Sequence, residues 1–172
     1  MAYAYAAALL FYHRENPYRR IPQAVKYLGN LSAGRYFAGL LGRKLAAAPH
    51  FADVDAVVPV PLHWLRRRHR GYNQAEVIAR ELARELHAAL YPRGLRRARR
   101  THSQTAFLAE ERLRNVRGVF RVHSLPQDLR HVLLVDDTFT TGATLAACYF
   151  ALRAFLGPAP RISVATLSVV EG

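Results

Sequence analysis

The chain has 172 residues, 51% apolar and 22% charged, and its 25 basic and 12 acidic side chains give a net charge of +13. This apolar share is too high for a disordered chain, and the length is typical of one domain with a sizeable core. The only cysteine, Cys148, excludes an internal disulfide and a zinc site built from several cysteines.

Most of the positive charge lies in one third of the chain. Residues 61–121 hold 15 arginines and five acidic residues, a net charge of +10, which leaves +3 for the rest. Such a concentration of charge attracts phosphate groups, on a nucleic acid or on a small metabolite. The alternative is an arginine-rich surface that is simply solvated, and composition alone does not separate the two.

The apolar N-terminal run, residues 4–12, indicates a buried helix or strand. It is too short to cross a bilayer, and no basic segment precedes it as a secretory signal requires. We therefore expect no membrane insertion and a cytoplasmic location. Apolar residues at helical spacing then predict a helix over residues 34–48, ended by Pro49.

Strands and helices alternate in the rest of the chain. Apolar runs predict strands at 55–61, 131–135 and 161–167, and a weaker one at 116–122. Apolar residues on one face predict helices at 74–90 and 142–156. The basic stretch 95–115 shows no strand alternation, and it fits either a mobile loop or a short helix near residues 107–113. This order predicts an α/β domain with a mostly parallel sheet.

The segment 132–144 joins a buried strand to two carboxylates and a loop of small residues. Asp136 and Asp137 would lie at the carboxyl edge of the sheet, where open α/β sheets bind ligands. Adjacent carboxylates repel each other, and ribose hydroxyls or Mg²⁺ would compensate for this repulsion. In the threonine and glycine loop, backbone N–H groups and hydroxyls can converge on an anion at a helix N-terminus. This combination fits a sugar phosphate; the alternative is a plain helix N-cap at Asp137 or Thr138.

The stretch resembles the phosphoribosyl pyrophosphate (PRPP) motif of type I phosphoribosyltransferases, with four apolar residues, two acids and Thr-Thr-Gly-x-Thr. Four further motifs are similar to the ComF/GntX family, which includes the ComF protein of bacterial competence: Pro59-Val60-Pro61-Leu62-His63, Arg70-Gly71-Tyr72-Asn73-Gln74, Arg97-x-Arg99-x-Thr101-x-x-Gln104 and Arg112-x-x-Asn115-Val116. The resemblance implies an α/β type I phosphoribosyltransferase fold, with a mostly parallel sheet flanked by helices. It also implies a small N-terminal hood (residues 1–50) and a core (residues 51–172).

The resemblance also implies roles for four groups of residues. Asp136 and Asp137 would bind the ribose hydroxyls. The 5′-phosphate would be held by Thr138, Thr140, Thr141, Gly142, Ala143 and Thr144. The loop facing pyrophosphate would contain Pro61, Leu62, His63 and Arg70. A mobile loop that closes over PRPP would contribute Arg97, Arg99, Thr101, Gln104 and Arg112.

The chemistry implied is transfer of phosphoribose to a nucleobase or other amine, with release of pyrophosphate. Mg²⁺ would be bound mainly through PRPP, near Asp136 and Asp137. Catalysis would rest on positioning and on stabilising the leaving group, with Asp137 as the expected proton acceptor and no side-chain nucleophile. No zinc is expected, because the four-cysteine ribbon of many family members is missing.

A second function stays open from the sequence. In this alternative, a catalytically silent fold binds single-stranded DNA and a competence helicase during DNA uptake. The arginine excess favours it, although no stretch of aromatic residues interleaved with basic ones is visible. Under either function we expect a PRPP-like or nucleotide-like ligand, and related enzymes suggest a homodimer.

Overall fold

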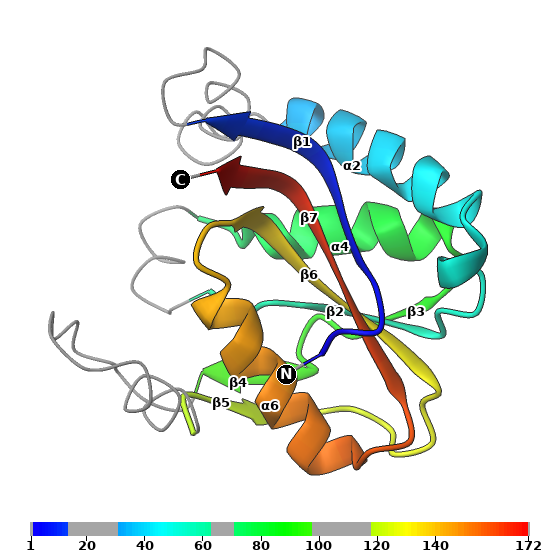
Figure 1. Cartoon of the computed structure of the whole chain (residues 1–172), viewed down its shortest axis with the longest axis vertical. Coiled ribbons are helices and arrows are strands. Elements are labelled where there is room, and N and C mark those ends of the chain that lie inside the picture. Colours follow the sequence, from blue (N-terminus) through cyan, green and yellow to red (C-terminus); the bar gives the residue numbers. More distant parts are fainter. Residues whose placement is uncertain (1, 14–30, 63–70, 98–117, 172) are drawn as a thin grey trace, which may run out of the picture.

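The computed structural model describes residues 2–13, 31–62, 71–97 and 118–171. Its centre is a five-stranded sheet in the order β1-β7-β6-β2-β3, and every neighbouring pair in it is parallel (Figure 1). The strands are β1 (Ala6–His13), β2 (Ala56–Pro59), β3 (Ala89–Leu90), β6 (His131–Phe139) and β7 (Arg161–Glu171). A separate antiparallel pair consists of β4 (Leu95–Arg97) and β5 (Phe120–Val122).

Helices cover both faces of this sheet. The helices are α2 (Leu31–Ala46), α4 (Gln74–Glu85) and α6 (Ala143–Leu156), and a 3₁₀ turn, η2 (Pro49–Phe51), follows α2. In Figure 1, α6 lies in front of the sheet, and α2 and α4 lie behind it. None of the described helices combines the length and apolarity needed to cross a membrane.

The central strand β6 explains why both faces need cover. Val132 and Leu134 pack into the cluster that contains α6 and the β4–β5 pair, while Leu133 and Val135 pack against α2 and α4. All four side chains are completely buried. A continuous apolar run is typical of a parallel strand covered on both sides, so the predicted α/β class is confirmed.

Two predicted element boundaries are wrong. The helix expected to reach residue 90 ends at Glu85, because Ala89 and Leu90 pair with β2 as the edge strand β3. His87, with a φ of +53°, turns the chain between the two elements. The expected loop 95–115 begins with a strand, β4, which pairs with β5 and carries Leu95 into the core. Both strands are too short to give a visible alternation in the sequence.

The N-terminal third contributes to the same layers as the rest of the chain. β1 is an edge strand that pairs with β7 from Ala6 to His13. α2 packs its buried Ala38, Leu41 and Leu45 with residues of α4 and of the sheet. The division into a hood (residues 1–50) and a core (residues 51–172) stays a prediction, and residues 14–30 lie outside the described residues.

Candidate functional site

The connections of the sheet place a ligand-binding crevice between β2 and β6. The crossover from β6 to β7 runs through α6 on one face, and the crossover from β2 to β3 runs through α4 on the other. Neighbouring strands whose crossovers leave toward opposite faces form a topological switch point. Ligands of open α/β sheets bind there, outside the carboxyl ends of the strands.

The acidic pair lies at this switch point. The pairing of β6 with β2 ends at Pro59 and Val135, whereas β6 continues beside β7 as far as Phe139. Asp136 and Asp137 therefore come directly after the last residue of β6 that has a strand on both sides. Both residues are partly exposed. The Asp136 carboxylate accepts a hydrogen bond of 2.9 Å from the backbone N–H of Asp137, which fixes one of its oxygens.

The phosphate loop predicted from the sequence encloses a small hollow. A space of about 40 Å³ is lined by Asp136 and by residues 138–145, which include all six predicted phosphate ligands. Thr140, Thr141, Ala143 and Thr144 are exposed, and the hydroxyl of Thr141 lies 3.5 Å from the backbone N–H of Ala143. The structure thus brings Asp136 and the predicted phosphate loop to one place, while Asp137, the next residue on β6, does not line this hollow.

Gly142 gives the loop its shape. Its φ of +71° is in the left-handed region, and it caps the N-terminus of α6 without a side-chain hydrogen bond. A Cβ atom at this position would lie 2.8 Å from Cζ of Phe139. Glycine is therefore required twice, by the backbone conformation and by the ring that packs against it. The turn directs the first N–H groups of α6 to the end of the sheet where Asp136 lies.

Two residues near the site have a role that the sequence analysis did not assign. Asn73 is buried, and its side-chain amide donates a 3.0 Å hydrogen bond to the carbonyl of Val60, where β2 leads into Pro61 and Leu62. Ser168, on β7, has its hydroxyl 3.1 Å from the hydroxyl of Thr138. An asparagine directly before a helix is an ordinary N-cap signal, so no local pattern indicated the bond to the Val60 carbonyl.

The predicted mobile loop is only partly covered by the structure. Arg97 is not in a loop: it is the last residue of β4, and its guanidinium carbon lies 5.5 Å from the centre of the Phe120 ring. That prediction is corrected, because the β4–β5 pairing includes Arg97. The other predicted residues lie outside the described residues: His63, Arg70, Arg99, Thr101, Gln104 and Arg112.

Two charged residues, Asp136 and Arg97, influence the buried Cys148 thiol in the core. Burial raises the pKa of the Cys148 thiol well above its usual value, and the Asp136 carboxylate acts in the same direction, while Arg97 opposes it. Since Cys148 is completely buried and its thiolate is disfavoured, this cysteine is a small apolar packing residue rather than a nucleophile.

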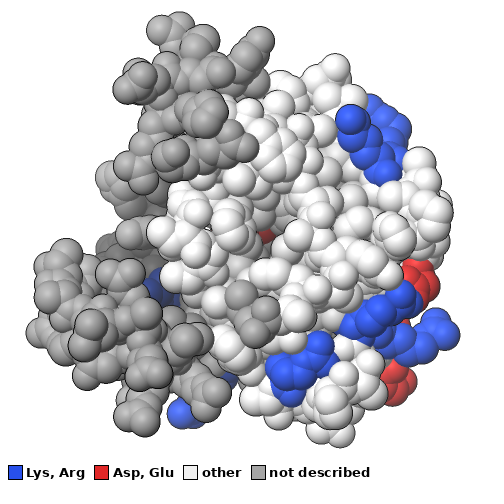
Figure 2. Space-filling model, in the orientation of Figure 1, with Lys and Arg blue, Asp and Glu red and all other residues white. Residues whose placement is uncertain are grey.

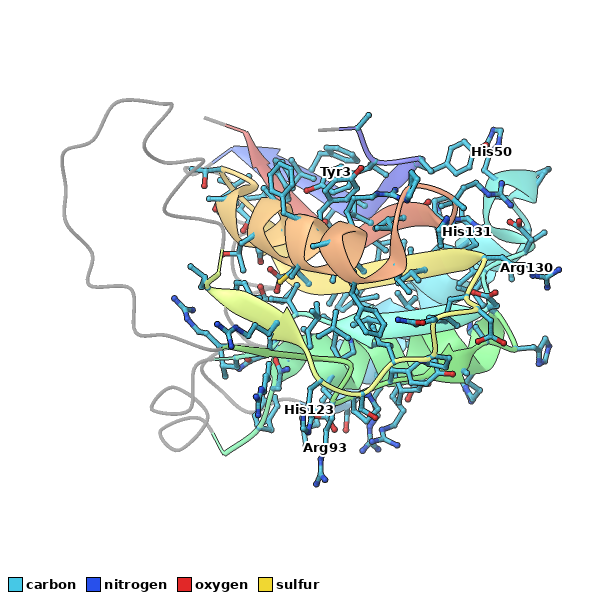
Figure 3. All side chains as sticks on the ribbon, turned by 90° about the horizontal axis from the view of Figure 1, so that it is seen from below. Tyr3, His50, Arg93, His123, Arg130 and His131 are labelled. Carbon is cyan, nitrogen blue, oxygen red and sulfur yellow. The ribbon has the colours of Figure 1, made fainter. Side chains whose placement is uncertain are left out.

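A second polar cluster lies at the opposite end of β6. The buried His131 ring has Nδ1 2.9 Å from Asp53 and Nε2 2.8 Å from the Ser163 hydroxyl. Figure 3 shows His131 at this end of the molecule, with Arg130 and His50 near it. The arrangement matches a serine–histidine–aspartate triad in connectivity, but Ser163 is completely buried and no substrate reaches it. The cluster instead ties β6 and β7 to the turn before β2.

The described residues offer no complete protein-only metal site. No group of three or more histidine, cysteine, aspartate or glutamate residues among them is arranged to hold a metal ion. The adjacent carboxylates of Asp136 and Asp137 provide hard oxygen ligands of the kind that Mg²⁺ accepts, together with phosphate oxygens.

Some basic side chains on the surface have acidic neighbours, and others do not. In Figure 2, basic side chains at the right margin lie beside acidic ones, while a basic patch near the lower edge has no acidic neighbour in view. On α4, the exposed Arg80 and Arg84 form ion pairs with Glu76, Glu81 and Glu85. Part of the arginine excess predicted to attract phosphate is thus neutralised within the chain.

The parallel sheet, its switch point and the acid–threonine–glycine loop are together consistent with a phosphoribosyltransferase-like fold. Among known proteins, the chain is similar to competence and DNA-utilization proteins. The chain is 39% identical over 92 residues to DNA utilization protein YhgH of Escherichia coli, covering 54% of this chain and 40% of that protein. It is 36% identical over 93 residues to competence protein F of Haemophilus influenzae, covering 53% and 41% of the two chains.

A more distant relative is competence protein ComFC of Bacillus subtilis, 29% identical over 115 residues, which cover 67% of this chain and 44% of that protein. No family model matches the chain. The chain is homologous to these competence and DNA-utilization proteins, which confirms the resemblance found in its motifs. The matched segments are less than half the length of these relatives.

Proposed function

We propose that the chain binds PRPP at the carboxyl ends of β2 and β6, as a phosphoribosyltransferase-like protein that acts in DNA uptake or utilization. The observation that carries this proposal is the position of Asp136 and Asp137 at the switch point, directly before the Gly142 turn and the N-terminus of α6. The carboxylates would accept hydrogen bonds from the ribose hydroxyls. The loop would hold the 5′-phosphate through its N–H groups and threonine hydroxyls.

The diphosphate would then lie toward β2. Pro61 and Leu62 follow the end of β2 on the neighbouring strand, and the Asn73 amide holds the carbonyl of Val60 in place. Mg²⁺ bound between the diphosphate and the acidic pair would neutralise charge on the leaving group. The site would position C1 of the ribose for attack by an amine, with Asp137 as the proposed proton acceptor.

Calorimetry with PRPP and Mg²⁺ tests the binding site. Asp137→Asn removes a charged hydrogen-bond acceptor, worth roughly 1.5 to 3 kcal/mol, so PRPP affinity should fall about tenfold or more. The matched control is Asp128→Asn, the same chemical change at an exposed residue before the opposite end of β6. Equal PRPP affinity in wild type and Asp137→Asn would rule out this assignment.

A separate assay tests the transfer reaction. Pyrophosphate release is measured with PRPP, Mg²⁺ and each of the common nucleobases in turn, and Asp137→Asn serves as the inactive reference. Release that depends on one base and is lost in the variant supports a phosphoribosyltransferase. PRPP binding without release on any base would limit the proposal to a binding protein.

A second candidate function is binding of single-stranded DNA, with or without a helicase partner. One observation favours it specifically: two exposed arginines, Arg96 and Arg121, face each other across the β4–β5 pair. Neither residue belongs to the hollow at the β6 loop. A ligand bound only in that hollow would therefore leave these two arginines without a binding partner.

A further inference from the structure

A larger hollow lies away from the β6 loop, between β5 and α6. Its volume is about 630 Å³. The hollow is open because the residues of α6 that face it include small alanines. Three aromatic rings also line it: Phe120, Phe150 and Phe155. Phe155 is 37% exposed, although large apolar side chains are usually buried. We call this hollow the α6 groove.

The rim of the α6 groove is basic. Arg121 lines the groove from β5, and Arg96 lies directly opposite Arg121 in the antiparallel pair. Like charges in this position destabilise a sheet. Neither side chain forms an ion pair or hydrogen bond in the part of the chain that the structure describes, whereas Arg80 and Arg84 on α4 do form ion pairs.

Two more basic groups lie next to the ends of the β4–β5 pair. His123 follows Arg121 by two residues, and its backbone N–H donates to the carbonyl of Gly94, which holds it next to the turn that contains Arg93. Figure 3 shows Arg93 and His123 side by side on the lower side of the molecule. Both are exposed. An apolar, phenyl-lined groove is therefore bordered by basic side chains, of which Arg96 and Arg121 have no ion-pair partner among the described residues.

We infer that the α6 groove and these basic side chains bind single-stranded nucleic acid. An unpaired base stacks on the exposed phenyl ring of Phe155, and the adjoining phosphates contact Arg96 and Arg121. Aromatic rings beside basic groups are the usual combination in single-strand binding sites. The bases of a duplex are stacked on one another and do not reach a groove of this kind. The inference rests on the second candidate function and gives it a location distinct from the PRPP site.

Two matched double variants test the phosphate contacts. Binding of a fluorescein-labelled 15-nucleotide oligo-dT is followed by fluorescence anisotropy at about 50, 100 and 200 mM salt. For Arg96→Ala/Arg121→Ala we expect roughly tenfold weaker binding, and a salt slope smaller by about 1.4 because two phosphate contacts are lost. Arg80→Ala/Arg84→Ala removes the same charge from α4 and should change affinity less than threefold, with the slope kept.

A third variant tests the groove. Phe155→Ala should weaken binding about fivefold or more at every salt concentration without changing the salt slope, because it removes stacking rather than charge. Phe155→Tyr keeps an aromatic ring and should bind like wild type. Thermal melting of every variant, followed by circular dichroism, verifies the fold, and PRPP calorimetry verifies the other site independently.

The possible results distinguish the proposed location of the nucleic-acid site from the second candidate function itself. A wild-type protein that does not bind the oligonucleotide overturns both the inference and the second candidate function, and leaves PRPP binding unaffected. Equal losses of oligonucleotide affinity in the two arginine double variants would rule out the α6 groove as the binding site. They would leave the second candidate function standing. Polyglutamate, added at the same total charge, serves as a competitor. If it displaces the oligonucleotide and Phe155→Ala does not change oligonucleotide affinity, the groove binds an acidic protein and the inference is wrong.

Discussion

Alanine at position 142 should destabilise the fold and weaken phosphate binding together. The φ of Gly142 is +71°, and an added Cβ would lie 2.8 Å from Cζ and 2.9 Å from Cε2 of Phe139. A left-handed conformation costs a residue with a side chain about 1 to 2 kcal/mol. Displacing the Phe139 ring adds an overpacking term of about 1 to 3 kcal/mol.

Two comparisons separate these contributions. Gly118 also has a positive φ, +93°, but an added Cβ there would meet nothing within 4 Å. Gly118→Ala should therefore cost only the backbone term, about 1 to 2 kcal/mol. In a Phe139→Ala background the ring is gone, so Gly142→Ala should also cost only the backbone term. The loss of unfolding free energy caused by Gly142→Ala is compared in the wild-type and Phe139→Ala backgrounds. The difference measures the contact with the ring, for which we expect about 1 kcal/mol or more.

Urea unfolding at pH 7.5 measures each free energy of unfolding, and calorimetry with PRPP measures the loop. The ring contact and the N–H groups of α6 share the same turn, so Gly142→Ala should lower PRPP affinity while Gly118→Ala should not. The reasoning is wrong if Gly142→Ala and Gly118→Ala destabilise equally, or if the cost of Gly142→Ala is the same with and without the Phe139 ring.

Two further predictions concern the ends of β6 and β2. Burial lowers the pKa of His131 below its usual value of 6.5, and Asp55 opposes this less strongly, so the native structure favours the neutral ring. As the pH falls below about 6.5, the unfolded chain binds more protons at this residue than the native chain does, and the free energy of unfolding decreases. Urea unfolding at pH 5.5 and 7.5 should show a smaller drop for His131→Gln than for the exposed-site control His123→Gln; equal drops would contradict this. Asn73→Ala leaves the Val60 carbonyl without its donor, and should cost about 1 to 3 kcal/mol in the same assay and weaken PRPP binding. Asn73→Asp, similar in size but without the amide donor, should lose as much; stability equal to wild type in both variants would contradict the role.

The fold was predictable wherever a long apolar run or a clear helical face exists. The run at 132–135 is such a case, since both of its faces are buried in the structure. The short strands were not predictable, because β3 has two residues and β4 has three, fewer than a period-two pattern needs. Their existence depends on partners far along the chain: Ala56 for Ala89, and Phe120 for Arg97.

The site was predictable where its residues are consecutive. Asp136 to Thr144 form one continuous segment, and strand, turn and helix bring them together without other parts of the chain. The contributions of Asn73 and Ser168 come from a helix N-terminus and from another strand. Neither residue type in that local pattern indicates a ligand site. Only the strand order, which no local signal specifies, places them beside the acidic pair.

The strand order also places the basic residues of this segment in different parts of the molecule. A small ligand with three phosphate groups needs only a few arginines, and the segment 61–121 contains 15. Within the described part of that segment, Arg80 and Arg84 are paired with acids, and Arg97 packs on Phe120. Arg93, Arg96 and Arg121 remain, and the last two lie opposite each other in the β4–β5 pair, beside a groove lined with phenyl rings. A single site at the switch point therefore does not account for the charge, because strand pairing turns Arg96 and Arg97, neighbours in the chain, toward opposite faces of the β4–β5 pair.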